Sequence, residues 1–196
     1  MKHSLRILVS FTTLTLLAPV GELLAQSGAI VPTREVLATL KPGQWIQLEG
    51  LPQKDGTVNC TEVKLLTGDL LDDNWTLRGL VRSVDAKNQQ FTVAKYPIRL
   101  KDRVEYDDEA GGKFKSFSDL RVGMLVKLDG TYLKDGSFLC QKIDHQTAKI
   151  VNKPGIEKRI QLAGKIERSN PTKRSVTAMG MTFFMTNNTR MKSVIK

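Results

Sequence analysis

The 196-residue sequence predicts an all-β protein made of tandem small β-barrel units, each built from repeated hairpins. Two internal repeats, and the glycines that their copies share, carry this prediction. The composition agrees with it, because 40% hydrophobic and 26% charged residues support a packed core and argue against wholesale disorder. The length allows one ordinary domain or two small ones.

The first repeat relates residues 41–66 to residues 121–146 at an offset of 80, without gaps. Seven of the 26 positions are identical, and three of these are glycine, a residue that marks backbone requirements. The identical pairs are Gly43/Gly123, Leu48/Leu128, Gly50/Gly130, Lys54/Lys134, Asp55/Asp135, Gly56/Gly136 and Cys60/Cys140. A short helical turn is expected before each copy, at 36–40 and 116–120.

Each copy of this repeat predicts a hairpin. Apolar and polar residues alternate at 45–48 and 125–128, as they do in a strand with one buried face. The Asp-Gly pairs that follow can take the positive φ angles of a tight turn. The return strands should then point the same side chains inward, namely Val58 and Cys60 in one copy and Phe138 and Cys140 in the other.

The second repeat has an offset of 85 and relates residues 75–83 to residues 160–168. Each copy is followed by a polar turn and another extended run. Residues 75–147 therefore hold a front half and a back half, which together make a complete unit. Residues 26–66 hold only a back half, and the basic segment 148–196 holds only a front half.

Five short strands in about 70 residues, with one helical turn between the third and the fourth, have the size and order of an OB-like barrel. Two arrangements of the terminal halves are open. They pair to close a second, circularly permuted barrel, or they extend one sheet without closing. We expect closure, because the missing pieces are complementary and closure covers strand edges that invite aggregation.

Three stretches resemble a known family: residues 79–93, 117–130 and 135–143. Their glycine and apolar pattern is similar to the bacterial domain-of-unknown-function family 5666, and exported bacterial OB-fold proteins of the stress-response type are a looser resemblance. The likeness covers the middle unit and parts of both halves, and it departs at Cys60 and Cys140, where a small alanine-like residue is usual. The family implies a small β-rich repeat in an exported protein, with no activity or site residues.

Residues 1–25 are typical of a secretory signal peptide, with a basic start, an apolar run and a small residue before the cut. We expect cleavage between Ala25 and Gln26, which makes the protein periplasmic or secreted. The alternative is an uncleaved anchor, but the run from Ile7 to Val20 has 14 residues, whereas a spanning helix needs about 20. No later apolar run is long enough to span a bilayer.

Catalytic and metal chemistry have little support in the sequence. Only two histidines and two cysteines are present, and removal of the signal segment leaves His145 as the one imidazole, which we expect to be solvated at the end of a strand. The acidic loop at 105–109 lacks the spacing of an EF-hand and is expected to be solvated rather than to bind calcium. We therefore predict a non-enzyme with no catalytic residues, no metal and no cofactor.

The net positive charge is concentrated at the end of the chain. Residues 149–196 hold 11 basic and two acidic side chains, whereas residues 26–148 are neutral overall. A basic surface attracts polyanions, although a solvated surface without a partner is the alternative. The residues predicted to contact a polyanion are Lys165, Arg168, Lys173, Arg174, Arg190 and Lys192.

These observations predict a non-catalytic binding or scaffold protein of the cell envelope. Its partner would be an envelope component or another protein. The first alternative is a binder of anionic polysaccharide, lipopolysaccharide or lipid headgroups through the basic segment. A second alternative is single-stranded nucleic acid, which needs aromatic platforms beside the cations. Phe183 and Phe184 lie in the basic segment, but one of them should face the core, and the export signal argues against nucleic acid.

Cys60 and Cys140 stand at equivalent positions of two repeats, in a protein expected in an oxidising compartment. A disulfide would need their α-carbons within about 7 Å. Equivalent positions in separate barrels would lie too far apart unless the units pack about a local twofold axis. Buried free thiols are the preferred interpretation, with a disulfide as the alternative.

Overall fold

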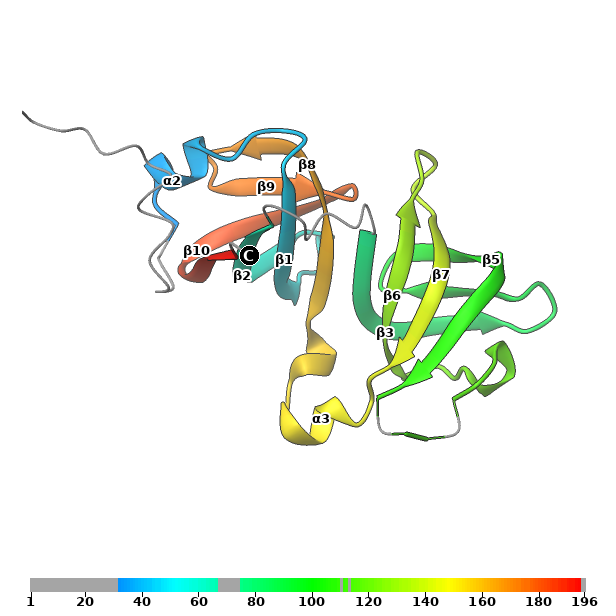
Figure 1. The fold of residues 1–196 in the computed structure, drawn as a ribbon. Coiled ribbons are helices and arrows are strands. Elements are labelled where there is room, and N and C mark those ends of the chain that lie inside the picture. The colour runs from blue at the N-terminus through cyan, green and yellow to red at the C-terminus, as the bar shows by residue number, and fades with distance from the viewer. Residues whose placement is uncertain (1–31, 67–74, 110, 113, 195–196) are drawn as a thin grey trace, which may run out of the picture.

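The computed structural model describes residues 32–66, 75–109, 111–112 and 114–194. The all-β prediction is confirmed, because the strands within these residues form two five-stranded barrels that lie side by side (Figure 1). We name them the middle barrel, which is continuous in sequence, and the terminal barrel, which combines strands from both ends of the chain. The predicted signal segment 1–25 lies outside the described residues.

The middle barrel is a closed ring of strands in the order β3-β4-β5-β7-β6, with β6 returning to pair with β3. The strands are β3 (Trp75–Asp85), β4 (Gln90–Val93), β5 (Tyr96–Asp108), β6 (Leu125–Tyr132) and β7 (Phe138–His145). Every pair is antiparallel except β5 with β7, which run parallel. The expected helical turn is the 3-10 helix η2 (Phe117–Asp119), between β5 and β6.

The terminal barrel repeats this arrangement with strands from both halves of the chain. Its strands are β1 (Trp45–Pro52), β2 (Val58–Leu66), β8 (Ile160–Asn170), β9 (Ser175–Ala178) and β10 (Met181–Val194). The strand β1 pairs antiparallel with β8, and β10 pairs parallel with β2, so the ring closes. The expected pairing of the two terminal halves is confirmed. The helix α2 (Arg34–Ala38) precedes β1, and α3 (Lys149–Asn152) and the 3-10 helix η3 (Ile156–Lys158) connect the barrels.

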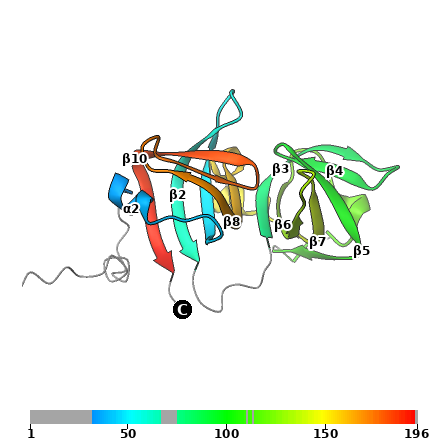
Figure 2. The same ribbon diagram turned by 90° about the horizontal axis from the view of Figure 1, so that it is seen from above.

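The edge-to-edge pairing of β3 with β8 joins the two barrels (Figure 2). Within the middle barrel, β4 pairs with β3 only from Val81 onward, so the first half of β3 has an edge that its own barrel leaves uncovered. The same is true of β8, and the two edges cover each other. Leu77 pairs with Leu162, its equivalent in the second repeat, so an approximate local twofold axis relates the barrels.

The two hairpin turns follow one pattern. Gly56 and Gly136 have φ angles of +82° and +83°, whereas the aspartates before them do not have positive φ. The expectation that both turn residues adopt positive φ is therefore corrected. Asp55 instead accepts hydrogen bonds from the backbone N–H of Thr57 at 3.0 Å and from its hydroxyl at 2.6 Å. The aspartate thus stabilises the turn through its side chain.

Gly50 and Gly130 explain why the hairpins share a glycine in the first strand. The register of each hairpin shifts at this residue, as in a β-bulge. A Cβ at Gly50 would lie 2.4 Å from the carbonyl oxygen of Asn59, and one at Gly130 would lie 2.2 Å from that of Leu139. Only glycine lets the two strands approach this closely.

Both cores are lined as the repeats predicted. The side chains expected to point inward are buried, namely Val58, Cys60, Phe138 and Cys140. Each helical turn adds a buried leucine to the core, Leu37 within α2 and Leu120 directly after η2. The interior of each barrel is therefore packed with side chains, and any ligand must bind on the outside or at the junction.

Candidate functional site

Two of the residues predicted to bind a polyanion, Arg168 and Lys173, line one hollow on the terminal barrel. The hollow has a volume of about 460 Å³ and lies beside β8, β9 and β10. Its other lining residues are Pro42, Glu167, Ser169, Asn170, Ser175, Thr177, Thr182 and Phe184. The cations, hydroxyl groups and ring come from three neighbouring strands and the turn after β8.

Hydrogen bonds fix several polar groups of this hollow. The hydroxyls of Thr177 and Thr182 lie 3.1 Å apart, across the β9–β10 pair. Asn170 accepts from the backbone N–H of Lys173 at 2.9 Å, which holds the turn that carries the lysine. Glu167 accepts from the backbone N–H of Gly180 at 2.9 Å. The hollow is therefore a shaped polar surface with two exposed cations at its edge.

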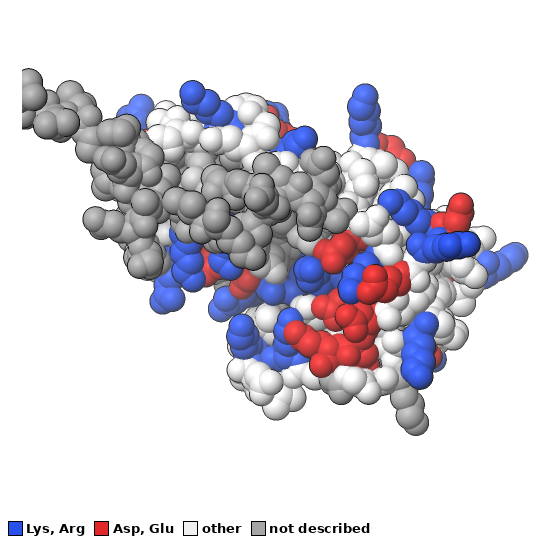
Figure 3. Space-filling model, in the orientation of Figure 1, with Lys and Arg blue, Asp and Glu red and all other residues white. Residues whose placement is uncertain are grey.

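The other four predicted cations lie elsewhere and have different neighbours. Lys165 lies over the ring of Trp45, 5.5 Å from its centroid. Arg174 donates to Asn187 at 2.8 Å and to the carbonyl of Pro32 at 3.2 Å. The six residues therefore do not form one continuous site, and Figure 3 shows Lys and Arg spread among other residues over the face it draws.

Arg190 and Lys192 lie on β10 beside the acidic Glu62 of β2. Arg190 stands opposite Glu62 in the strand register, and Lys192 forms an ion pair with it at 3.1 Å. Burial raises the pKa of Glu62, but hydrogen bonds from Lys192 and Lys64 outweigh this effect, and the net pKa is lowered. Glu62 is therefore ionised at neutral pH and offsets part of the positive charge of Lys64, Arg190 and Lys192.

The acidic stretch 105–109 was expected as a loop, but residues 105–108 form the end of strand β5, where they pair with β7, and the acidic side chains contact cations. Lys142 contacts both Glu105 and Asp107, and Glu109 contacts Lys149 at 2.7 Å. Among the described residues there is no group of three or more His, Cys, Asp or Glu side chains placed to hold a metal ion. In Figure 3 many of the visible acidic side chains gather in a central patch with Lys and Arg beside them, and others lie apart from it.

His145 differs from its sequence expectation, because only 19% of its side chain is exposed. Its Nδ1 lies 3.4 Å from an oxygen of Asp108, its Nε2 lies 2.8 Å from the hydroxyl of Thr147, and its ring lies against Phe114. An acid, an imidazole and a hydroxyl in this order also occur in hydrolases. Here the hydroxyl of Thr147 accepts from the backbone N–H of Leu125 at 3.1 Å, which ties it to strand β6.

Cys60 and Cys140 are free thiols, each buried in the core of a different barrel. Each thiol donates to the carbonyl two residues later, at Glu62 and Lys142. Burial raises the pKa of both thiols to about 12. They therefore act as small apolar core residues rather than as nucleophiles.

Sequence reasoning missed a charged hollow at the junction of the barrels, with a volume of about 400 Å³. Glu49 of β1 is its centre: one carboxylate oxygen accepts from Arg78 at 2.8 Å and the other from Arg159 at 3.0 Å. The full lining is Glu49, Glu62, Lys64, Arg78, Lys153, Pro154, Ile156, Arg159 and Gln161. The sequence held one sign of this hollow: Arg78 is a charged residue at a repeat position where the other copy has the small apolar Ala163.

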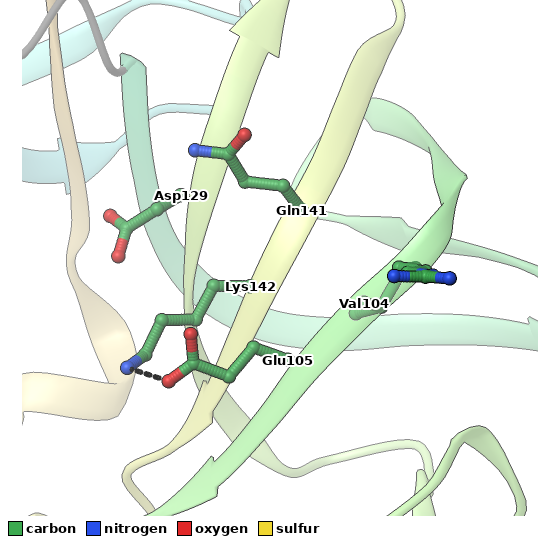
Figure 4. Close-up of a pocket in the computed structure, with 6 residues that line it drawn as sticks. Val104, Glu105, Asp129, Gln141 and Lys142 are labelled. Atoms are coloured by element: carbon green, nitrogen blue, oxygen red, sulfur yellow. Dashed lines mark hydrogen bonds and ion pairs between the residues drawn. The ribbon is translucent and has the colours of Figure 1, made fainter.

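A matching hollow of about 570 Å³ lies on the middle barrel (Figure 4). Asp129 and Lys142 stand there at the positions that Glu49 and Glu62 occupy in the terminal barrel, 80 residues earlier. In Figure 4 the side chain of Lys142 reaches Glu105 across the β5–β7 pair, and Asp129 lies on the neighbouring strand. The two barrels thus carry equivalent hollows with different charges.

Comparison with known families identifies the middle barrel. Residues 78–144 match the family model described as a domain of unknown function (DUF5666), so the chain contains a domain of this family, as the resemblance indicated. The matched segment runs from β3 to β7 and leaves out the terminal barrel. No curated protein and no solved structure matches the chain. Within the described residues, no helix has the length and apolar character needed to cross a bilayer.

Proposed function

We propose that the protein is an exported, non-catalytic binding protein of the cell envelope that holds an anionic polysaccharide on its terminal barrel. The observation that carries the proposal is the hollow beside β8, β9 and β10, which combines two exposed cations with hydroxyl groups and a half-buried ring. The proposal of export rests on the signal-like segment at residues 1–25, which predicts a periplasmic or secreted location.

The chemistry of the hollow suits an acidic sugar chain. Arg168 and Lys173 offer charged donors for carboxylate, sulfate or phosphate groups. The hydroxyls of Thr177 and Thr182 can exchange hydrogen bonds with sugar hydroxyls, and the ring of Phe184 offers an apolar face. A few placed polar groups around an apolar surface are typical of small-ligand sites.

The barrel topology supports a binding role. Counted within one unit, the strand order of the middle barrel is 1-2-3-5-4-1, with a parallel pair between strands 3 and 5 and a helical turn between strands 3 and 4. We propose that both barrels are OB-like on this ground. Barrels of that type bind oligosaccharides and oligonucleotides on their outer faces.

Retention on a charged polysaccharide tests the proposal. The chain beginning at Gln26 should bind to immobilised heparin and to polygalacturonate, and added salt should release it because ions screen exposed charges. The double variant Arg168→Ala/Lys173→Ala should lose retention. Its matched control is Lys54→Ala/Lys134→Ala, which removes two exposed lysines at the hairpin turns and should keep most of the retention.

Three results would contradict the proposal. No retention of folded protein would make the charge a surface property and favour a protein scaffold. Equal loss in the variant and its control would show that net charge alone decides binding. Tighter binding to a single-stranded oligonucleotide than to either polysaccharide would favour nucleic acid.

A further inference from the structure

We propose that the hollow at the junction of the two barrels is a second binding site, for a sugar that carries a phosphate group. It shares no lining residue with the hollow beside β8, β9 and β10. It is formed by β1, β2 and β8 of the terminal barrel, β3 of the middle barrel and the connector after α3. The inference is therefore independent of the polysaccharide proposal.

The charge of the junction hollow favours an anion. Its lining holds four cations and two carboxylates, a net charge of +2. The equivalent hollow on the middle barrel holds two cations, Arg103 and Lys142, and two carboxylates, Glu105 and Asp129, so its net charge is zero. The repeat thus supplies an internal comparison, in which only the junction hollow has an excess of positive charge. A phosphate monoester, with a charge between −1 and −2 at neutral pH, complements this excess.

Arg78 provides the buried donor of this site. Only 10% of its side chain is exposed, and its Nη2 is bound to Glu49. Its Nε is buried and has no hydrogen-bond partner among the described residues. Because Arg159 binds the other oxygen of Glu49, one carboxylate balances two guanidinium groups, and an anion in the hollow would stabilise this excess of positive charge.

Two further cations line the hollow and are exposed to solvent. Arg159 uses Nη1 on Glu49 and keeps 43% of its side chain exposed, so other N–H groups remain for a ligand. Lys153 is exposed, and no carboxylate of the described residues pairs with it. Arginine and lysine together are the side chains that hold phosphate groups in proteins.

The size and the other lining residues of the hollow suit the sugar part of the ligand. A volume of about 400 Å³ is larger than a bare phosphate ion needs and falls within the range of small-molecule sites. Glu49 and Glu62 would repel a chain of many negative charges, but their oxygen atoms can accept hydrogen bonds from hydroxyl groups. Gln161 adds an amide, and Pro154 and Ile156 form an apolar wall. One anionic group with several hydroxyls fits this lining.

The test is a titration of the chain beginning at Gln26 with glucose 1-phosphate. The ¹⁵N–¹H amide spectrum of the protein is recorded at each addition. The largest shifts should occur at Lys153, Arg159 and Gln161, and glucose at the same concentration should leave these signals in place. Lys153→Ala and Arg159→Ala should each weaken binding about tenfold. Lys153→Ala removes an exposed side chain, so loss of the fold would not explain its effect.

Arg103→Ala is the matched control, because it removes a cation from the equivalent hollow of the middle barrel and should not change the affinity. The proposal is overturned if folded protein gives no shifts, if glucose gives the same shifts, or if Lys153→Ala and Arg159→Ala bind like the parent. Shifts confined to Arg168 and Lys173 would also overturn it. Because the polysaccharide proposal depends on those last two residues, the two proposals fail separately.

Discussion

Leu77 and Leu162 lie opposite each other at the antiparallel pairing that joins the two barrels, and they are the same residue of the repeat in two copies. The pairing covers the edge of β3 with the edge of β8. Each barrel thus covers the strand edge that the other leaves open, and an open edge is a site of aggregation. The protein is therefore one structural unit in which each closed barrel needs the other to cover an open strand edge.

Removal of the C-terminal strands should disturb both barrels. A chain that ends at residue 148 lacks β8, β9 and β10, so the β1–β2 hairpin loses its pairing with β8 and β10 and the edge of β3 is uncovered. Hydrogen exchange should show that residues 45–66 lose protection, and light scattering should show association of the chains. A chain that ends at Val194 is the control and should stay protected and monodisperse. Full protection of residues 45–66 in the shortened chain would contradict the closed terminal barrel.

Gly164 should be far more sensitive to substitution than its equivalent, Gly79. A Cβ at Gly164 would lie 2.3 Å from ring atoms of Trp75, whereas one at Gly79 would lie 3.1 Å from a methyl group of Val93. Because Trp75 also packs against Trp45 and cannot easily move, we expect Gly164→Ala to lower the free energy of unfolding by about 1–3 kcal/mol.

Urea unfolding followed by tryptophan fluorescence measures both variants. Gly79→Ala should cost less, because a methyl group can shift by a few tenths of an ångström more easily than a packed indole ring. The fluorescence spectrum of folded Gly164→Ala should also change, since Trp75 must be displaced. Equal losses of stability in the two variants would show that Trp75 does not lie against Gly164.

Cys60 and Cys140 should be unreactive in the folded protein. Their pKa values near 12 keep the thiols protonated at neutral pH, and burial excludes reagents. An aromatic disulfide reagent at pH 8 should therefore label neither cysteine in native protein and both in denaturant. Labelling of native protein at the rate of an exposed thiol would contradict the burial of the two side chains. A mass deficit of two hydrogens in protein purified without reductant would show the alternative disulfide.

The repeats predicted the fold well where backbone constraints are local. At Gly50 and Gly130 the two strands of a hairpin lie too close together for any side chain. The glycine shared by the two copies therefore carried structural information, which comparison of the repeats within one chain could detect. The β3–β8 junction could not be predicted in the same way. Periodicity indicates which face of a strand is buried. It does not indicate which other strand pairs with the edge of β3 at Leu77 or with the edge of β8 at Leu162.

The candidate site was predictable only in part, for a related reason. Arg168 and Lys173 flank a single turn, so their closeness follows from local sequence. Arg190 and Lys192 lie on β10, and the parallel pairing of β10 with β2 brings them to Glu62, which is distant in sequence. A count of charges along the chain does not show that a carboxylate from a distant segment lies beside these cations. Glu49 and Arg78 meet in the same way, through contacts between barrels.

The hairpin aspartates should make stability depend on acid pH. Hydrogen bonds from Thr57 lower the pKa of Asp55, and hydrogen bonds from Ser137 lower that of Asp135. A carboxylate whose pKa is lower in the folded state stabilises the protein above its unfolded pKa of about 3.9, and this contribution is lost as the pH falls through the folded pKa. The melting temperature should therefore fall as the pH is lowered from about 5 to about 2.

Asp55→Asn and Asp135→Asn isolate this contribution, because asparagine keeps an acceptor oxygen but cannot ionise. Each variant should melt below the parent at pH 7, and the difference should close near pH 2, where the parent carboxylates are also neutral. Asp102→Asn removes an exposed carboxylate of β5 and is the matched control for the loss of one negative charge. A difference that persists unchanged at low pH would assign the role of these aspartates to the shape of the turn instead of to their charge.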